Sequence, residues 1–182
     1  MSRRLMFLSF ALLFLEGCTG GLSVTTQTMT MQMTSPAFAD GERIPVNYTA
    51  DGADKSPELR WGGIPPNTQS FALICEDPDA PRGTWTHWVL FNIPADMAGY
   101  AQGVPAEKEL PGGARQGKND FSKIGYGGPS PPKGKPHRYY FKLYALDTKL
   151  DLPAGATRQQ VLDALKGHVL AEGQLMGTYG RS

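Results

Sequence analysis

The sequence predicts a mainly β domain made of short strands and many turns. Glycine and proline are abundant, with 22 and 15 copies in 182 residues, and both residues interrupt helices and mark turns. Runs of branched and aromatic residues lie between these interruptions, as at 70–75 and 89–93, which is typical of buried strands. One segment near the C-terminus has a helical pattern with its own start signal.

The strands are predicted in order along the chain. Residues 28–34 alternate threonine or glutamine with methionine, and four turn pairs follow: Asp40-Gly41, Asp51-Gly52, Gly62-Gly63 and Pro65-Pro66. The next strand is 70–75, and its successor runs from Trp85 to Ile93. Because alternate side chains of a strand share a face, we expect one apolar face in this second strand, made of Trp85, His87, Val89, Phe91 and Ile93.

The later elements follow a Gly-rich segment, 99–120, which we expect to be a long surface excursion with Gln116, Lys118, Asn119 and Asp120 near a site. The strand 137–146 carries its cationic residues on one face, so the other face should point into the core. Thr157-Arg158-Gln159-Gln160 matches a helix capping box. Apolar residues then continue at helical spacing, so a helix ending at Gly173, with His168 in its last turn, and a final strand near 177–181 are predicted.

Residues 1–28 read as a separate targeting segment. Arg3 and Arg4 precede eleven uncharged residues, 5–15, a run too short to span a bilayer, for which about 20 are needed. This is typical of a signal peptide. Cys18, directly after Gly17, resembles the lipidated cysteine of bacterial lipoproteins, although Glu16 departs from that pattern. We expect a signal peptide at 1–17, lipidation at Cys18, a flexible tether at 18–28 and a single domain at 29–182.

Charge and cysteine content narrow the function. Loss of residues 1–17 would lower Lys+Arg from 18 to 16 and Asp+Glu from 17 to 16, so the mature chain is near neutral. It has no basic stripe of the kind that nucleic-acid binding requires. With Cys18 lipidated, Cys75 remains alone within an apolar run, where a buried, unreactive thiol is expected.

The loop between the strands 70–75 and 85–93 is the first candidate site. It carries Asp77 and Asp79, and Pro78 and Pro81 restrict its backbone. His87 follows on an otherwise apolar strand face. Alone, this pattern more often marks a turn and a core histidine than a functional site.

A second segment has the same combination of a stiff loop and a histidine at the start of a strand. Residues 125–136 are rich in glycine and proline, and His137 and Tyr139 then begin the inward face of the strand 137–146. Two of the three histidines therefore follow stiff loops at the start of inward strand faces. We interpret this repetition as one polar site at the rim of the core.

These segments together resemble the phosphatidylethanolamine-binding protein family, most closely its bacterial Raf-kinase-inhibitor-like (YbhB/YbcL) branch. The resemblance rests on Asp-Pro-Asp-Ala-Pro at 77–81, His-Trp at 87–88 and Gly-Gly-Pro-x-Pro-Pro-x-Gly-x-x-His-Arg-Tyr-x-Phe at 127–141, and it extends from about residue 29 to the end. It implies an antiparallel β-sandwich with a small anion-binding pocket and no cofactor or metal. The implied polar groups are those of Asp77, His87, Gly128, His137 and Tyr139, with Asp79 and Pro81 shaping the wall.

The sequence and the resemblance are compatible with three functions. The first is a non-enzymatic module that binds a phosphoryl or other small anionic ligand, anchored in the cell envelope through Cys18. The second is a hydrolase or metal enzyme using the His/His/Asp set, although no Gly-x-Ser-x-Gly or His-Glu-x-x-His motif is present. The third is regulation of a kinase or protease by protein contact, as the resemblance suggests, together with a homodimer. Tyr179 is a further residue expected to approach the pocket.

Overall fold

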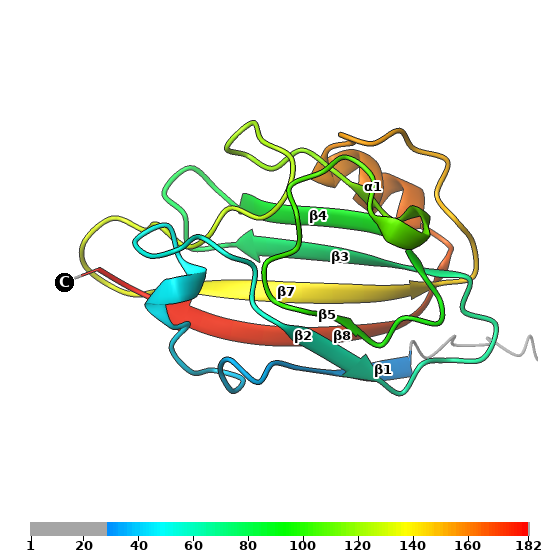
Figure 1. Ribbon diagram of the computed structural model, residues 1–182, viewed down its shortest axis with the longest axis horizontal. Coiled ribbons are helices and arrows are strands. Elements are labelled where there is room, and N and C mark those ends of the chain that lie inside the picture. Colours follow the sequence, from blue (N-terminus) through cyan, green and yellow to red (C-terminus); the bar gives the residue numbers. More distant parts are fainter. Residues whose placement is uncertain (1–28, 182) are drawn as a thin grey trace, which may run out of the picture.

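The computed structural model describes residues 29–181 as one curled, mainly β sheet with a single α-helix (Figure 1). The eight strands lie in the order β5-β2-β1-β8-β7-β3-β4-β6. Their bounds are β1 Met29–Thr34, β2 Leu59–Gly62, β3 Ser70–Asp77, β4 Trp85–Pro94, β5 Gly99–Tyr100, β6 Arg115–Gln116, β7 His137–Leu146 and β8 Val169–Tyr179; α1 is Arg158–Leu165, and 3₁₀ turns occupy Val46–Tyr48 and Pro111–Gly113. The predicted mainly β class is confirmed.

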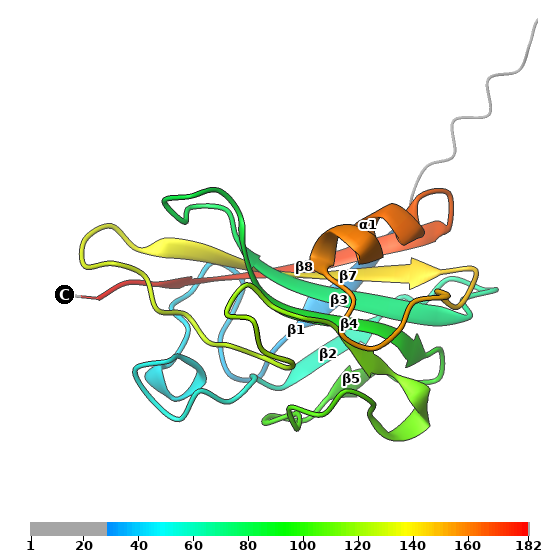
Figure 2. The same ribbon diagram turned by 90° about the horizontal axis from the view of Figure 1, so that it is seen from above.

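The sheet folds over itself at β1. Residues Met29–Met31 of β1 pair with β8 in parallel, whereas Gln32–Thr34 pair with β2 in antiparallel. Figure 2 shows β2 and β5 on one side of the central strands and α1 on the other. The architecture is therefore sandwich-like but formed by one mixed sheet, and the expectation of purely antiparallel pairing is corrected by the β1–β8 pair.

The main core fills the space inside this fold. Trp61 of β2 packs edge-on against Phe71 of β3, with ring centroids 5.7 Å apart, so the two halves of the sheet meet face to face. Phe141 and Leu143 of β7 are fully buried in the same cluster. The alternation predicted for 137–146 is confirmed, because its inward positions from Tyr139 onward are buried and its cationic positions are not.

Strand β4 departs from simple alternation. Cys75 pairs with Trp88 and Glu76 with Thr86, so His87 is an extra residue without a partner on β3. A second irregularity falls at Asn92, which has a positive φ of 55°. Such bulges redirect side chains. The predicted common face from Trp85 to Ile93 is consequently wrong: Val89 and Phe91 pack under α1, whereas Ile93 belongs to the main core.

The helix is shorter than the sequence pattern predicts. The capping box at Thr157 and Gln160 is present, but the helix ends at Leu165 and Gly167 adopts φ +82°. The apolar residues after it pack as part of β8. Gly173 is within that strand, and His168 lies between the two elements, where its Nδ1 is 2.8 Å from Asp147. The prediction of a longer helix containing His168 is therefore wrong.

The remaining predictions concern the segment 99–120, Cys75 and the N-terminal segment. The excursion 99–120 holds two short strands, and Gln116 is fully buried, with its side chain bonded to Trp88. Cys75 is buried as expected, and burial raises the pKa of its thiol. The signal peptide, the tether and Cys18 lie outside the described residues. No helix within 29–181 is both long and apolar enough to cross a membrane.

Candidate functional site

The loops after β3 and before β7 meet at one end of the molecule, where they enclose a cavity of about 320 Å³. Asp77 is the last residue of β3, and His137 is the first of β7, which is the neighbouring strand. His87 enters from the β4 bulge. The cavity is lined by Asp77, Ala80, Pro81, Arg82, Trp85, His87, Phe121, Ser130, Pro131, Pro132, His137 and Tyr139.

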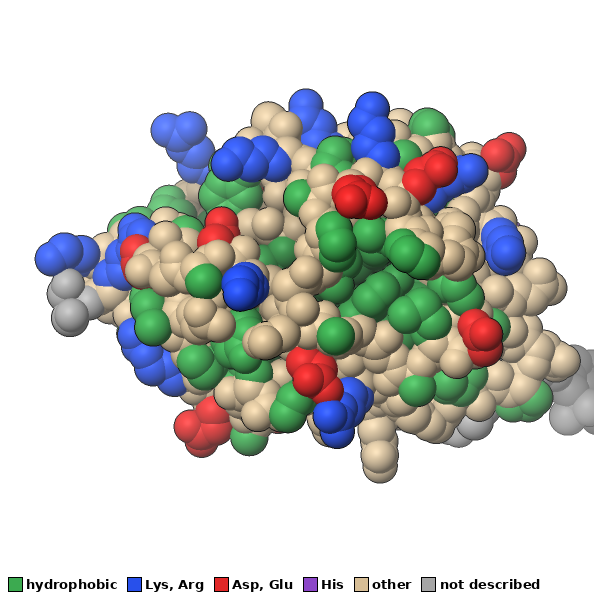
Figure 3. Space-filling model, in the orientation of Figure 1, with side chains coloured by type: hydrophobic (Ala, Val, Ile, Leu, Met, Phe, Trp, Pro, Cys, Tyr) green, Lys and Arg blue, Asp and Glu red, His purple; other side chains and the backbone are tan. Residues whose placement is uncertain are grey.

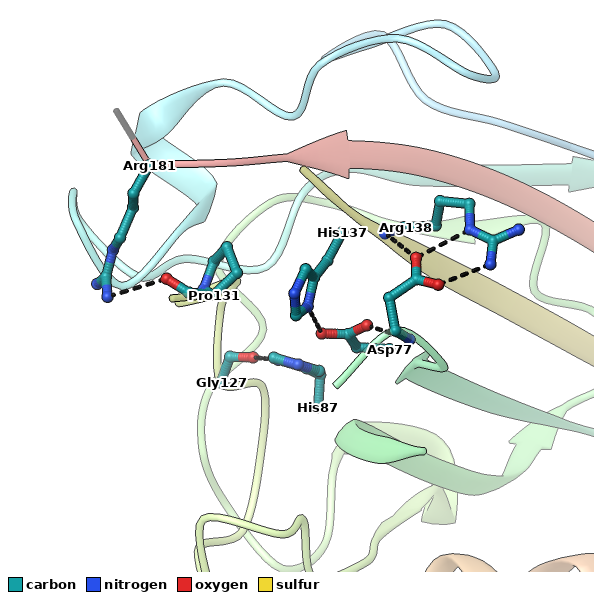
Figure 4. Close-up of polar contacts among 8 residues, drawn as sticks. Asp77, His87, Gly127, Pro131, His137, Arg138 and Arg181 are labelled. Carbon is teal, nitrogen blue, oxygen red and sulfur yellow. Dashed lines mark hydrogen bonds and ion pairs between the residues drawn. The ribbon is translucent and has the colours of Figure 1, made fainter. Parts of the chain in front are cut away.

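Asp77 organises the site. Its carboxylate is buried, and Oδ2 accepts a hydrogen bond from Nδ1 of His137 at 2.7 Å. Its other oxygen accepts from the backbone N–H of Asp79 at 2.8 Å. Figure 4 shows Asp77 and His137 joined in this way, with the His87 ring beside them. One carboxylate thus fixes both the imidazole and the start of the loop.

Asp79 holds the loop against β7 from outside. Its carboxylate accepts hydrogen bonds from the backbone N–H and the guanidinium of Arg138, at 2.7 to 3.0 Å. The Arg138 hydrogen bonds lower the pKa of Asp79 to about 2. Asp79 does not line the cavity. Its bonds to Arg138 hold the loop backbone that forms the cavity wall, and Pro81 of the same loop lines the cavity directly.

His87 is held from the opposite wall. Its Nδ1 donates to the carbonyl of Gly127 at 2.5 Å, and the N–H of Gly127 donates back to the carbonyl of His87 at 3.0 Å. The ring packs edge-on against Tyr139 and Phe121, with centroids 5.1 and 5.3 Å away. Burial lowers the pKa of His87.

Tyr139 presents an unusual polar group to this site. The residue is 1 % exposed and lines the cavity, yet its buried hydroxyl has no hydrogen-bond partner within residues 29–181. A buried hydroxyl left unpaired costs about 1–3 kcal/mol. Burial, followed by the nearby carboxylate of Asp77, raises the pKa of Tyr139, so the phenol keeps its proton.

Gly128 does not occupy the place expected for it. Its N–H donates to Oδ1 of Asp54 at 2.6 Å, and the residue is not among those lining the cavity. A Cβ at this position would lie 2.7 Å from that oxygen and 2.8 Å from the carbonyl of Tyr48. The glycine is needed for close packing of the loop, and its N–H is not free for an anion.

The wall at 130–132 is attached to the C-terminus. Arg181 donates to the carbonyl of Pro131 at 3.3 Å and pairs with Asp51. Tyr179 donates to the same carboxylate at 2.8 Å and does not line the cavity, contrary to expectation. Hydrogen bonds from Arg181 and then Tyr179 lower the pKa of Asp51 to about 2.

Sequence reasoning missed several cavity residues. Phe121 directly follows the weakly patterned excursion 99–120, and Arg82 lies in the loop that was singled out for its aspartates. Pro131 and Pro132 lie inside the Gly-Pro-rich segment, whose path the sequence does not specify. Trp85 was recognised only as a strand residue. The sequence does hold one signal for Phe121, because it is the only aromatic residue in the polar segment 101–125.

The fold and site define a small β-sheet domain with a cavity, lined by two histidines, at one end of its curled sheet. The family model of phosphatidylethanolamine-binding proteins matches residues 34–180, and the chain belongs to this family, with the YbcL-like proteins among its relatives.

Individual relatives cover nearly the whole domain. A UPF0098 protein of Methanothermobacter thermautotrophicus is 54 % identical over 83 % of this chain and 99 % of its own length. A UPF0098 protein of Aquifex aeolicus is 46 % identical over 83 % of this chain and 89 % of its own. E. coli YbcL, described as a member of the mammalian PEBP family, has a TM-score of 0.78 at 36 % identity, covering 84 % of this chain and 99 % of its own. The Chlamydia trachomatis homologue CT736 has a TM-score of 0.77 at 39 % identity, covering 85 % of this chain and all of its own.

Proposed function

We propose that this protein binds a small anionic ligand, foremost a phosphate or phosphoryl group, in the cavity between Asp77, His87, His137 and Tyr139. The observation that carries the proposal is that two histidines line one cavity together with Tyr139, whose buried hydroxyl has no hydrogen-bond partner in the described residues. Hydroxyl and imidazole donors suit the oxygens of a phosphoryl group. The apolar wall of Trp85 and Phe121 can hold the substituent of a phosphate ester.

We propose a binding role rather than a catalytic one. An activated serine needs a base within hydrogen-bond reach. Ser130 is the one hydroxyl side chain besides Tyr139 that lines the cavity, and neither histidine ring is hydrogen-bonded to it in the described part of the chain. Within residues 29–181 no group of three or more metal-ligating side chains could hold an ion. These contacts favour ligand capture over hydrolysis.

The same proposal places the domain at a membrane surface. The support is the signal-like segment 1–17 and Cys18, followed by the Thr- and Gly-rich stretch 19–28. A doubly or triply acylated cysteine anchors a protein stably. Mass spectrometry of the N-terminal peptide from the membrane fraction tests this, because an unmodified Cys18 in that peptide would remove the anchor from the proposal.

The binding proposal is tested with a phosphate titration. We expect His137→Ala to weaken phosphate binding by at least about tenfold, since the variant loses a charge-assisted contact worth about 1.5–3 kcal/mol. Isothermal titration calorimetry gives the affinity. His168→Ala is the matched control, because His168 also pairs with an aspartate but lies at the other end of β7. Equal affinities for the wild type and His137→Ala would refute the proposal.

A further inference from the structure

The two cavity histidines are held by chemically different partners. Nδ1 of His137 faces the carboxylate of Asp77, whereas Nδ1 of His87 faces the neutral backbone carbonyl of Gly127. A carbonyl oxygen only accepts hydrogen bonds. Nδ1 of His87 must therefore carry a proton, and the second ring nitrogen, Nε2, holds a lone pair whenever the ring is neutral.

The surroundings disfavour the charged form of the His87 ring. The side chain lies among Phe121, Tyr139 and the strand, and the residue is 3 % exposed. Burial lowers the pKa of His87; the bond to Gly127 and the carboxylates of Asp77, Asp120 and Asp54 oppose that effect without reversing it. The titratable and charged groups around the ring are Asp77 from β3, His137 and Tyr139 from β7, and Asp54, Arg82 and Asp120 from loops.

Nε2 of His87 is available to a ligand. Only the Nδ1 atom of this ring is hydrogen-bonded in the described chain, and Nε2 is not among the atoms that are both fully enclosed and unpaired. Because His87 lines the cavity, its free lone pair opens onto the place where an anion would lie. An unprotonated anion oxygen at that place would direct its lone pair at the lone pair of Nε2, and the two would repel each other. An oxygen that carries a proton would instead donate to Nε2.

We infer that the cavity selects tetrahedral anions that still carry a proton, such as the monoanion of a phosphate monoester, with Nε2 of His87 as the acceptor of that proton. The inference rests on the proposed function and names its ligand class more closely. His137 and the Tyr139 hydroxyl supply donors to the unprotonated oxygens, so the cavity offers both an acceptor and donors. Sulfate, which has no proton at neutral pH, satisfies only the donors.

The full-length protein and three probes test the inference. At pH 5, methyl phosphate is mostly a monoanion with one P–OH group, because the second pKa of a phosphate monoester is about 6. Dimethyl phosphate has the same charge and no proton, and sulfate has no proton and no extra methyl group. We expect methyl phosphate to bind at least about tenfold more tightly than either, because the others leave a buried acceptor unpaired. Calorimetry measures the three affinities.

The position of the proton is tested separately, because a monoanion on neutral His87 and a dianion on charged His87 contain the same number of protons. The ¹⁵N signals of the His87 ring in the methyl phosphate complex should show a proton on Nδ1 alone. In His87→Gln the amide can rotate to donate, so the preference for methyl phosphate should fall to within about threefold. The affinity of the wild type for sulfate should rise as the pH falls through the pKa of His87, which burial lowers.

The outcomes separate the two proposals. Equal binding of methyl phosphate, dimethyl phosphate and sulfate, or a doubly protonated His87 ring in the methyl phosphate complex, would overturn the selectivity while leaving anion binding intact. Failure of all three probes to bind would overturn the anion-binding function itself, and the inference with it. If His87→Gln does not fold, the affinities and the ring signals of the wild type decide the question alone.

Discussion

Asp77→Ala should weaken phosphate binding by about thirtyfold or more. The substitution removes the only carboxylate that contacts His137 within the described chain, at 2.7 Å, and the acceptor for the backbone N–H of Asp79. His137 would lose its fixed tautomer and orientation, and the loop would lose its anchor at the end of β3. Breaking a charge-assisted pair of this kind costs about 1.5–3 kcal/mol, which corresponds to about a tenfold to hundredfold change in affinity.

Two variants separate the causes of that loss. Asp77→Asn keeps an acceptor oxygen but not the charge, so its affinity should fall between those of Asp77→Ala and the wild type. Asp147→Ala removes a similar carboxylate–histidine pair outside the cavity, and its affinity should match that of the wild type. Calorimetry gives the affinities, and thermal melts confirm folding. Wild-type binding by folded Asp77→Ala would mean that Asp77 does not organise the site.

Glu76→Ala should lower the free energy of unfolding by about 2 kcal/mol at pH 7. Glu76 is 5 % exposed, and its two oxygens accept hydrogen bonds from Lys142 of β7 at 2.5 Å and Arg158 of α1 at 2.6 Å. Breaking a fully buried ion pair costs about 3–5 kcal/mol. The smaller value is expected because the Lys142 and Arg158 side chains are 34 % and 28 % exposed and can reach water.

The effect of Glu76 should also depend on pH. Burial alone would raise the pKa of this carboxyl, but the hydrogen bonds from Lys142 and Arg158 outweigh burial and lower it. A lowered pKa in the folded state stabilises the protein above the unfolded value of about 4.3, and that stabilisation is lost as the pH falls through the folded-state pKa. The difference between wild type and Glu76→Ala should therefore shrink below about pH 4.

Urea unfolding at several pH values measures this difference. Glu172→Ala is the control, because Glu172 is exposed on β8 and is not paired with a cation at salt-bridge distance in the described residues. Its stability should stay within about 0.5 kcal/mol of the wild type. A Glu76→Ala deficit that is unchanged between pH 7 and pH 3 would show that packing, and not the charge, accounts for the effect.

The sequence predicted the strands of the site well, because their signals are local. The alternation of β7 places Tyr139 inward, as the structure shows, and the strand predicted at 70–75 lies within β3, which continues to Asp77. Both signals lie within a few neighbouring residues. For the same reason the capping box of α1 was visible in four residues.

The features that were missed depend on contacts between distant segments. The β4 bulge at His87 follows from its register against β3, and no residue of β4 alone indicates it. The same holds for Gly128, whose N–H is occupied by Asp54, 74 positions away. The end of α1 was misplaced because the apolar residues of β8 continue the helical spacing by chance. Where contacts between distant segments determine the local backbone geometry, neighbouring residues in the sequence do not indicate that geometry.

The surface of the folded domain agrees with its near-neutral composition. On the face seen in Figure 3, lysine and arginine side chains are interspersed with aspartate and glutamate. Ion pairs such as Arg60–Glu58 and Lys166–Asp163 contribute to this mixture. Exposed pairs of this kind contribute little to stability, about 0–1 kcal/mol each. The charges expected to have the largest effects are therefore the buried ones, Asp77 on ligand binding and Glu76 on stability.

If an anion binds in the cavity lined by His87 and His137, the three histidines of the chain report its binding in one experiment. Ring NMR signals of all three are followed while phosphate is added to the protein. The signals of His87 and His137 should shift together and saturate, whereas His168, at the far end of β7, should not move. If neither cavity histidine responds, or only His168 does, the anion site is not where we have placed it.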